Sequence, residues 1–441
     1  MSFESKVLER IKPTAEEVER IDRTADALKK EVEDYVRKNN IDVEIRFVGS
    51  YAKGTYLSDP DIDLFILFPE TVPHRELETV GLSVGEAVMK NGERMYSEHP
   101  YTRGVYNDLD VDLVPSYSLK TTERLRTAVD RTPFHTQYVL DNLKDVQKDE
   151  VRLLKRFMKG IGVYGAEPNT RGFSGYLCEL LVLYYGSFLR VLEGASLWKE
   201  GMIITVDKKG PPIMGPLVVY DPVDQKRNVA SAVHLDTMAL FIVASKAYLS
   251  SPSEKFFFPA DREPHSREKL QEISDTNGSR MVTVVFDRPD VVEDNLYSQL
   301  WKTRYALTRK LNDFDYNVLR AVHEMYEKKL EIVFELERDV LSKTYKHTGP
   351  PVWVKAADSF LLKWKNNVYG PPFIEDGCWN VIAERMYFTA KEMLADEAAV
   401  SGIGREIDPQ NMKIRDHEAS LNETNPLLLT ELLDSKNSWE V

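Results

Sequence analysis

FVGSYAKGTYLSDPDIDLFILF, residues 47–68, sets two acidic residues, Asp61 and Asp63, in an apolar run that is typical of a buried strand. A buried carboxylate must be paired, neutralised or bound to a cation, because burying it alone is costly. On a strand, residues i and i+2 lie on the same face, so both carboxylates are expected to point the same way. The stretch therefore predicts a strand that presents two negative charges to a strongly positive ligand.

A second acidic pair follows in LDVDLVPSY, residues 109–117, where Asp110 and Asp112 have the same spacing on another predicted strand. If the two strands are neighbours, three carboxylates can converge. Hard oxygen ligands of this kind suit Mg2+, which binds few protein carboxylates and leaves room for substrate phosphates. The pattern leaves open whether Asp110 or Asp112 supplies the third carboxylate.

The residues just upstream of the first acidic pair are suited to a triphosphate. Gly49 lets the backbone approach an anion closely, and free amides at the start of the short helix expected at 51–56 favour phosphate. Ser50 adds a hydroxyl, and Lys53 adds a positive charge. The alternative, a surface turn followed by solvated acids, fits poorly with the apolar residues of 62–68. We therefore expect a triphosphate at Gly49 and Ser50, with its metal ion on the two acids.

Composition places the chain among ordinary globular proteins. Its 441 residues are enough for roughly two to four domains, and 42% are hydrophobic and 29% charged. The net charge of −13 argues only weakly against a nucleic-acid partner, because the local distribution of Lys and Arg decides binding. Two distant cysteines, Cys178 and Cys378, exclude a disulfide framework and a zinc site and favour a reduced, cytoplasmic compartment. Cys178 lies in an apolar helical pattern and is expected in the core. No apolar run reaches the length of a membrane span.

Hydrophobic periodicity divides the chain into a mixed first part and a helical second part. A helix is expected after Thr14, which has capping-box spacing to Glu17, and the strands that follow it predict a small mixed sheet up to about residue 130. Residues 201–220 indicate a strand pair or a loop. The segments expected as strands are 43–48, 61–68, 109–117 and 281–286, and those expected as helices are 74–90, 151–162, 174–192, 236–251 and 296–342.

An apolar residue, Gly-Ser, ten residues, Asp-x-Asp in an apolar strand and a third Asp on a later strand together resemble the polymerase β-type nucleotidyltransferases. Further stretches narrow the resemblance to the class I, archaeal-type CCA-adding enzymes, which are tRNA nucleotidyltransferases. These stretches are EHPYTRGVY (98–106), VDLVPSY (111–117), AVDRTPFHTQYV (128–139), EVRLLKRFMKGIGVYGAE (150–167), RGFSGYLCELLVLYYGSF (171–188) and DPVDQKRNVA (221–230). The resemblance runs from about residue 10 to about 300 and is thin after about 370.

This resemblance implies an α+β multidomain fold. A polymerase β-type nucleotidyltransferase head with a mixed sheet would span 1–133, a helical neck that recognises the nucleotide 134–257, and an α/β body and tail that bind tRNA 258–441. The implied activity adds C, C and A to the tRNA 3′ end from CTP and ATP without a nucleic-acid template, by two-metal nucleotidyl transfer that releases pyrophosphate. Mg2+ is the implied cofactor. The implied partners are tRNA, CTP and ATP, with no membrane, and a homodimer stays open.

Matched motif by motif, the resemblance implies that Asp61, Asp63 and Asp112 are the catalytic metal ligands, which favours Asp112 over Asp110. Lys53 stands where the family usually has Arg, so the bidentate fork of a guanidinium is lost. Taken alone, most of the other matched residues could be a helix cap, a solvated helix face, core or a surface charge. The nucleotide-binding residues so predicted are Gly49, Ser50, Lys53, His135, Lys155, Tyr164, Asp224 and Arg227.

Arg227 matches the side chain that reads the edge of the incoming base, and Asp224 is close enough in sequence to orient it. A fork of donors fits the acceptors on the pairing edges of C and A, whereas U and G present an N–H there that would stay unpaired. Clusters of Lys and Arg are expected to contact tRNA phosphates, because duplex RNA is recognised largely through its shape and backbone. The RNA-binding candidates are Arg152, Arg156 and Lys159; Arg304, Arg309 and Lys310; and Lys343 and Lys346.

Two other functions stay open on the sequence. A poly(A) polymerase or an oligoadenylate synthase-like enzyme would keep the fold and change the substrate, and long A tails made from ATP alone would identify it. A catalytically inactive RNA-binding module would keep the fold without the reaction. The presence of all three acids speaks against that module.

Overall fold

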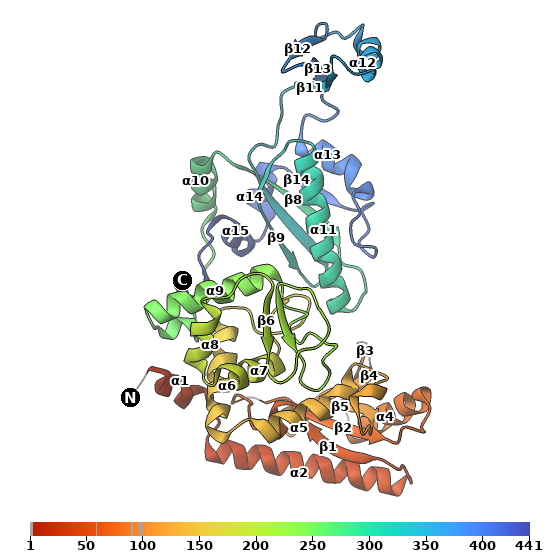
Figure 1. The fold of residues 1–441 in the computed structure, drawn as a ribbon, viewed down its shortest axis with the longest axis vertical. Helices are drawn as coiled ribbons and strands as arrows, with labels where there is room; N and C mark the ends of the chain where they lie inside the picture. The colour runs from red at the N-terminus through yellow and green to blue at the C-terminus, as the bar shows by residue number, and fades with distance from the viewer. Residues whose placement is uncertain (1–2, 59, 90, 97–99) are drawn as a thin grey trace. The chain divides into compact units, whose positions relative to one another are not determined.

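The chain forms two compact units (Figure 1), one of Met1–Asp261 with Asn437–Val441 and the other of Arg262–Lys436. The predicted domain borders at 133/134 and 257/258 stay predictions. The residues that the computed structural model describes are 3–58, 60–89, 91–96 and 100–441. Residues 98 and 99 of the stretch EHPYTRGVY lie outside them.

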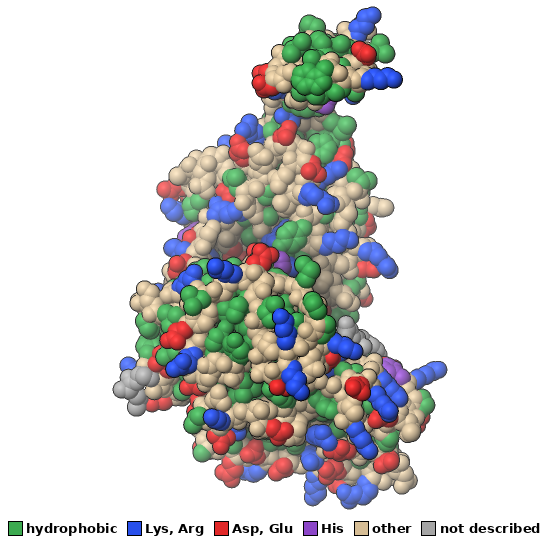
Figure 2. Space-filling model, in the orientation of Figure 1, with side chains coloured by type: hydrophobic (Ala, Val, Ile, Leu, Met, Phe, Trp, Pro, Cys, Tyr) green, Lys and Arg blue, Asp and Glu red, His purple; other side chains and the backbone are tan. Residues whose placement is uncertain are grey.

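Charged side chains of both signs are interspersed on the face of the molecule seen in Figure 2. The net charge of −13 is therefore not gathered into one acidic patch on that face. Single basic side chains thus have acidic neighbours, and the contacts of each one decide whether it can reach a phosphate.

Unit 1 begins with a five-stranded sheet in the order β1-β2-β5-β4-β3. Strands β2 and β5 are parallel and the other neighbours are antiparallel, so the predicted mixed sheet is confirmed. The strands are β1 (Glu44–Val48), β2 (Ile62–Phe68), β3 (Glu93–Tyr96), β4 (Pro100–Tyr106) and β5 (Leu109–Tyr117). β2 lies inside the sheet, between β1 and β5, and is largely buried on both faces, as its near-continuous apolar sequence requires.

One face of this sheet packs against helices α2 (Ala15–Lys38) and α4 (His74–Val88). Helix α2 begins at the predicted capping box, which is present. Its apolar stripe shares a core with Ile62 and Leu64 of β2. Because strand side chains alternate, Asp63 projects from the opposite face of the sheet. The acidic face is thus the one that the two helices leave uncovered.

The rest of unit 1 is mainly helical. The helix expected at 174–192 is two helices, α7 and α8, which bend by 91° at a break that contains Gly186, whose φ is +99°. The predicted strand pair within 201–220 is present as parallel β6 (Met202–Thr205) and β7 (Leu217–Tyr220). The helices are α1 (Phe3–Ile11), α5 (Thr132–Asn142), α6 (Asp145–Gly160), α7 (Gly175–Tyr185), α8 (Phe188–Ala195) and α9 (Leu235–Ser250).

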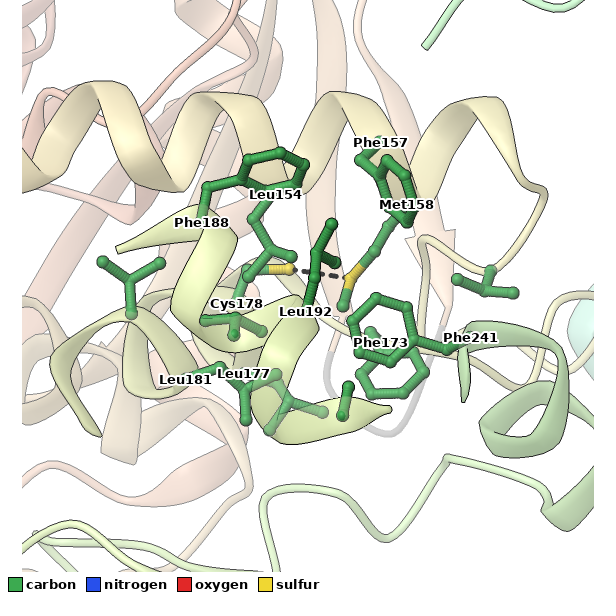
Figure 3. Close-up of a cluster of buried hydrophobic side chains, with 14 of the residues drawn as sticks. Leu154, Phe157, Met158, Phe173, Leu177, Cys178, Leu181, Phe188, Leu192 and Phe241 are labelled. Atoms are coloured by element: carbon green, nitrogen blue, oxygen red, sulfur yellow. Dashed lines mark hydrogen bonds between the residues drawn. The ribbon is translucent and has the colours of Figure 1, made fainter. Parts of the chain in front are cut away.

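Helices α6 to α9 share an aromatic core, which Figure 3 shows in close-up. The ring of Phe157 packs edge-on against Phe188, with centroids 5.5 Å apart, and against Phe241, at 6.3 Å. Cys178 is fully buried there, with its Sγ 3.5 Å from Sδ of Met158. This burial confirms the prediction of a core cysteine, and it raises the pKa of the thiol to about 12. No single helix in the described part of the chain is long and apolar enough to span a membrane.

Unit 2 contains two antiparallel sheets, one in the order β14-β8-β10-β9 and the other in the order β11-β13-β12. The strands are β8 (Arg280–Asp287), β9 (Val318–Met325), β10 (Lys329–Leu336), β11 (Thr344–Pro351), β12 (Phe373–Glu375), β13 (Cys378–Glu384) and β14 (Lys413–Arg415). The helices are α10 (Arg267–Asn277), α11 (Glu293–Asp313), α12 (Ala356–Trp364), α13 (Ala390–Glu397), α14 (His417–Glu423) and α15 (Pro426–Leu433).

The helix predicted over 296–342 is wrong for more than half of its length. Helix α11 ends at Asp313, and the hairpin β9–β10 follows. The Lys- and Glu-rich sequence of this hairpin has good helix propensity, but β10 pairs with strands on both sides and is buried along nearly its whole length. Burial between two neighbouring strands has overridden the local preference.

Candidate active site

The two acidic strands are neighbours, as the predicted site requires. β2 and β5 pair in parallel, and the register places Asp63 opposite Asp112. Asp61 comes directly before β2 and is expected on the same face as Asp63. The face opposite helices α2 and α4 therefore presents acidic residues from two adjacent strands.

These carboxylates destabilise one another. Burial, followed by repulsion from Asp112 and Asp61, raises the pKa of Asp63 to about 7. Desolvation is also the largest cause of the raised pKa of Asp61; attraction to Arg103 opposes it, and repulsion from Asp112 and Asp110 adds to it. A divalent cation at this position would relieve the repulsion.

Arg103 of β4 stands opposite Asp112 across the antiparallel β4–β5 ladder. Its Nε and Nη2 donate to Oδ1 and Oδ2 of Asp112 at 2.7 and 2.8 Å, which makes a bidentate ion pair. Asp112 is only 9% exposed, so the guanidinium supplies the counter-charge that its burial needs. The sequence pattern did not indicate Arg103, because its partner depends on the register between two strands.

The donor set fits a hard divalent ion such as Mg2+, because it consists of carboxylate oxygens. Among the described residues, however, no group of three or more His, Cys, Asp or Glu side chains is placed to hold a metal ion. Both carboxylate oxygens of Asp112 are engaged by Arg103 in this structure. Arg103 would therefore compete with a cation for this carboxylate.

Gly49 opens the short helix α3 (Gly49–Lys53) in a conformation that favours glycine, with φ of +69°. A Cβ at this position would lie 1.9 Å from Oδ2 of Asp63. The expected close approach of an anion is therefore made by the chain's own carboxylate. The backbone N–H of Gly49 donates to Oγ1 of Thr136 on α5 at 3.3 Å. Ser50, the next predicted residue, is partly buried in α3.

Lys53 and Lys155, which were predicted to contact phosphates, are gathered around one buried acid. Nζ of Lys53 donates to Oε2 of Glu179 at 2.6 Å, and Oγ1 of Thr55 donates to Oε1 at 2.6 Å. Nζ of Lys155 donates to the carbonyl oxygen of Thr55 at 3.0 Å and lies 3.7 Å from Oε1 of Glu179. Both lysines are buried, so a solvated helix face for Lys155 is excluded. Glu179 was missed, although it is a single acid in the apolar run LCELLVL.

Tyr164 lies beside the same lysine. A Cβ on Gly175, the first residue of α7, would lie 3.0 Å from Oη of Tyr164 and 3.6 Å from Nζ of Lys155. The absence of a side chain at Gly175 therefore leaves room for both groups. Burial raises the pKa of the Tyr164 hydroxyl, which keeps it protonated as a hydrogen-bond donor.

A second buried acid, Asp221, holds His135 and Arg227. Its Oδ2 lies 2.9 Å from Nε2 of His135 and accepts from Nη1 of Arg227 at 3.0 Å, while its Oδ1 accepts from Oη of Tyr176 at 3.2 Å. The ring of His135 stacks on Tyr176, with centroids 4.0 Å apart. Burial lowers the pKa of His135, although the hydrogen bond with Asp221 opposes this. Burial works against ionisation of Asp221 as well, yet its hydrogen bond with His135 keeps the pKa of that carboxyl low.

The carboxylate that orients Arg227 is therefore that of Asp221, which corrects the role expected for Asp224. Asp224 accepts from Nε of Arg131 at 3.0 Å. An open cavity of about 670 Å³ lies beside these residues and is lined by Arg227, Asp224, Arg131 and Val223 among others. Its position gives the Arg227 guanidinium access to a bound ligand.

Only part of the first predicted RNA-binding cluster is exposed to solvent. The buried Arg152 donates from Nη2 and Nε to the carbonyl oxygens of Gly54 and Tyr56, at 2.7 and 2.8 Å, so it clamps α6 to the loop after α3. The alternative of a solvated helix face is therefore excluded for Arg152, and its predicted contact with RNA stays a prediction. Arg156 is partly buried, and Lys159 is exposed.

In unit 2, the predicted cluster lies on α11. Arg304 donates to the carbonyl oxygen of Ala321 at 3.0 Å, and Lys310 pairs with Glu397 at 2.7 Å. Arg309 is exposed. The remaining candidates, Lys343 and Lys346, are exposed and pair with Glu384 and Glu375.

Three family models match this chain in succession. A nucleotidyltransferase domain matches residues 28–135, the second domain of tRNA nucleotidyltransferase matches 149–258, and the C-terminal domain of the CCA-adding enzyme matches 277–417. Together they cover the candidate site and most of unit 2.

Relatives match over most of their length. The CCA-adding enzyme of Methanosarcina mazei is 39% identical over 410 residues, which cover 91% of this chain and 90% of the relative. The CCA-adding enzyme of Archaeoglobus fulgidus is 37% identical over 388 residues, with 88% and 87% covered. Among solved structures, Cid1 poly(U) polymerase with Mg and 3′-dATP bound aligns at 16% identity with a TM-score of 0.46, over 57% of this chain and 94% of that one.

Proposed function

This chain belongs to the family of the CCA-adding enzymes, and on that premise we propose that it adds C, C and A to the 3′ end of tRNA from CTP and ATP. It is a nucleotidyltransferase, and its polymerase β-type head carries the reaction. The observation that carries the proposal within the structure is the pairing of Asp63 with Asp112 on the face of the sheet opposite helices α2 and α4. That arrangement suits in-line nucleotidyl transfer with release of pyrophosphate.

Nucleotidyltransferases of this superfamily use divalent metal ions, and we propose that the ion here is Mg2+ held by Asp61, Asp63 and Asp112. When bound, such ions lower the pKa of the attacking 3′-hydroxyl and stabilise charge on the leaving pyrophosphate. The carboxylates would hold the ions in place, and Gly49 leaves the space that the Asp63 carboxylate occupies. Asp112 is preferred to Asp110 because the register places Asp112 next to Asp63.

The triphosphate is proposed to lie over the cluster of Lys53, Lys155 and Tyr164, with Ser50 and His135 beside it. Buried cations and fixed donors bind phosphate strongly, because little solvent screens them and little reorganisation is needed. The shared carboxylate of Glu179 leaves the two lysines with a net positive charge. That charge supports a phosphate subsite at this end of the site.

The base is proposed to face Arg227 across the open cavity. Asp221 fixes the plane of the guanidinium and so decides where its donors point. Cytosine and adenine offer acceptors on their pairing edges, whereas uracil and guanine would place an N–H against these donors. The site would therefore favour C and A.

The parts of the chain are assigned by the same proposal. Residues 1–133 would be the catalytic head, 134–257 the neck that recognises the nucleotide, and 258–441 the body and tail that bind tRNA. Both cysteines are free, which supports a cytoplasmic setting. Measurement of the molecular mass in solution would show whether the chain forms a homodimer.

Incorporation into tRNA that lacks its terminal CCA tests the function directly. CTP alone should yield addition of two C residues, and A should be added only after them. UTP and GTP should not be used. Long A tails from ATP alone would instead indicate the poly(A) polymerase alternative, and no metal-dependent incorporation would indicate the inactive RNA-binding module.

A further inference from the structure

Glu179 is a fully buried acid at the meeting point of three segments of unit 1. Its carboxylate accepts hydrogen bonds from Lys53 of α3 and from Thr55 in the loop that follows, both at 2.6 Å. Lys155 of α6 approaches it at 3.7 Å. Glu179 itself belongs to α7. Its carboxylate therefore links α7 to α3, to the loop after α3 and to α6.

The two buried ammonium groups of this cluster depend on the Glu179 carboxylate as their counter-charge. Lys53 and Lys155 are 6% and 3% exposed, and two buried ammonium groups without a counter-charge would repel and lose their protons. The carboxylate of Glu179 offsets one of the two positive charges. A net positive charge then remains for an anion.

The hydrogen-bonding capacity of the lysines points in the same direction. An ammonium group has three N–H donors. In the described part of the chain, Lys53 donates one hydrogen bond, to Glu179. Lys155 donates two, to the carbonyl and hydroxyl oxygens of Thr55. Donors therefore remain on both ammonium groups.

We propose that Glu179 is a positioning residue for the nucleotide triphosphate, which keeps Lys53 and Lys155 charged and aimed at the phosphates without touching them. This inference rests on the proposed function. A second residue of α7 also supports a predicted nucleotide contact. Tyr176 lies one turn before Glu179, and its ring stacks on His135. Glu179 therefore lies on the same stretch of α7 as a support for a third predicted phosphate contact.

The role proposed for Glu179 also predicts a change in the pH dependence of CTP binding. Burial lowers the pKa of Lys155; attraction to Glu179 opposes this, and Lys53, Cys178 and Arg152 also face the lysine. Loss of the Glu179 charge would lower the pKa of Lys155 further. Lys155 would then lose its proton at a lower pH, and CTP affinity would fall at that lower pH.

The experiment compares binding of CTP and CMP by calorimetry in the wild type and in Glu179→Gln. We expect the dissociation constant for CTP to rise roughly tenfold or more, because a charge-assisted contact is lost, while that for CMP stays unchanged. As pH rises, CTP affinity should fall at a lower pH in Glu179→Gln than in the wild type. Glu179→Asp keeps the charge and should recover part of the CTP affinity.

Glu335→Gln provides the matched control. Glu335 is 1% exposed in unit 2, where it accepts from Ser279 and pairs with Arg320, so its loss should lower stability without changing the ratio of CTP to CMP affinity. If Glu179→Gln changes stability but leaves that ratio and the pH profile unchanged, Glu179 is only structural and the inference is overturned.

Thr55→Val decides the matter if Glu179→Gln does not fold. It removes the hydrogen bond that Thr55 donates to the same carboxylate and the one that Lys155 donates to the Thr55 hydroxyl, and it should weaken CTP binding selectively, by a smaller factor. An unchanged CTP-to-CMP ratio in Thr55→Val would also overturn the inference. A wild type that incorporates C and A shows that the proposed function stands even then, whereas a wild type without incorporation removes the function itself.

Discussion

At the scale of single residues, Gly49 sets the distance between the backbone and Asp63. Gly49→Ala would strain a backbone with φ of +69° and place Cβ 1.9 Å from Oδ2 of Asp63. We expect a loss of about 2 kcal/mol or more in the free energy of unfolding, together with loss of nucleotide incorporation, because the carboxylate must move. Urea unfolding and the incorporation assay measure the two effects.

Gly278→Ala separates strain from displacement of the carboxylate. Gly278 has φ of +65°, and a Cβ there would meet nothing within 4 Å. It should therefore lose only about 1 kcal/mol and retain incorporation. Full incorporation by Gly49→Ala would show that the position of Asp63 does not depend on this glycine.

Asp63 gives the metal-free protein a pH-dependent stability. Its pKa is about 7 in the folded chain against 3.8 as the usual value, so the folded state binds the proton more tightly than the unfolded state. The resulting stability is present below pH 3.8 and is lost as pH rises to about 7, by at most about 4 kcal/mol. Asp63→Asn should remove this dependence.

In a chelator at pH 8, Asp63→Asn should therefore unfold at higher urea than the wild type. Added Mg2+ should stabilise the wild type and have little effect on the variant, because one proposed ligand is gone. A variant less stable than the wild type in chelator would mean that the carboxylates are not in net repulsion.

At the scale of secondary structure elements, the register of β4 against β5 opposes Arg103 to Asp112. Arg103 competes with a cation for the same carboxylate, so Arg103→Ala should bind Mn2+ roughly three- to tenfold more tightly in the absence of nucleotide. Electron paramagnetic resonance of free Mn2+ measures this affinity. Arg103→Lys keeps the charge and should stay close to the wild type, and weaker Mn2+ binding by Arg103→Ala would contradict the competition.

Local patterns predicted the elements whose signals are local. The period-two acids and the apolar run of 61–68 were sufficient for β2 and its acidic face, and the Thr14 capping box for the start of α2. The hairpin β9–β10 was missed because its stability comes from pairing with β8, about fifty residues away in the chain.

The contacts that hold the candidate site together were not predictable where they join residues far apart in the sequence. Glu179 meets Lys53 across 126 positions, and Asp221 meets His135 across 86. No spacing rule connects such residues, because only tertiary packing brings them together: Glu179 lies on α7 and Lys53 on α3, whereas Asp221 follows β7 and His135 lies on α5. Asp224 was expected to orient Arg227 because it is close to it in sequence, whereas the structure places the carboxylate of Asp221 against Arg227.

At the scale of the whole molecule, an acidic protein must bind tRNA through local contacts. Arg309 of α11 is exposed, whereas its neighbours Arg304 and Lys310 already contact other groups of unit 2. We expect Arg309→Glu to weaken tRNA binding and to reduce the slope of log affinity against log salt by about 1, because one phosphate contact is lost. CTP affinity should not change, since the nucleotide site is built from unit 1.

Arg405→Glu is the matched control for this prediction. Its side chain is 92% exposed in the same unit and outside α11, and the substitution changes the net charge by the same amount. If total charge governed tRNA affinity, both variants would weaken binding equally in filter-binding titrations at several salt concentrations. A loss confined to Arg309→Glu would assign the contact to α11, and equal affinity of both variants to the wild type would exclude this face of α11 from the tRNA interface.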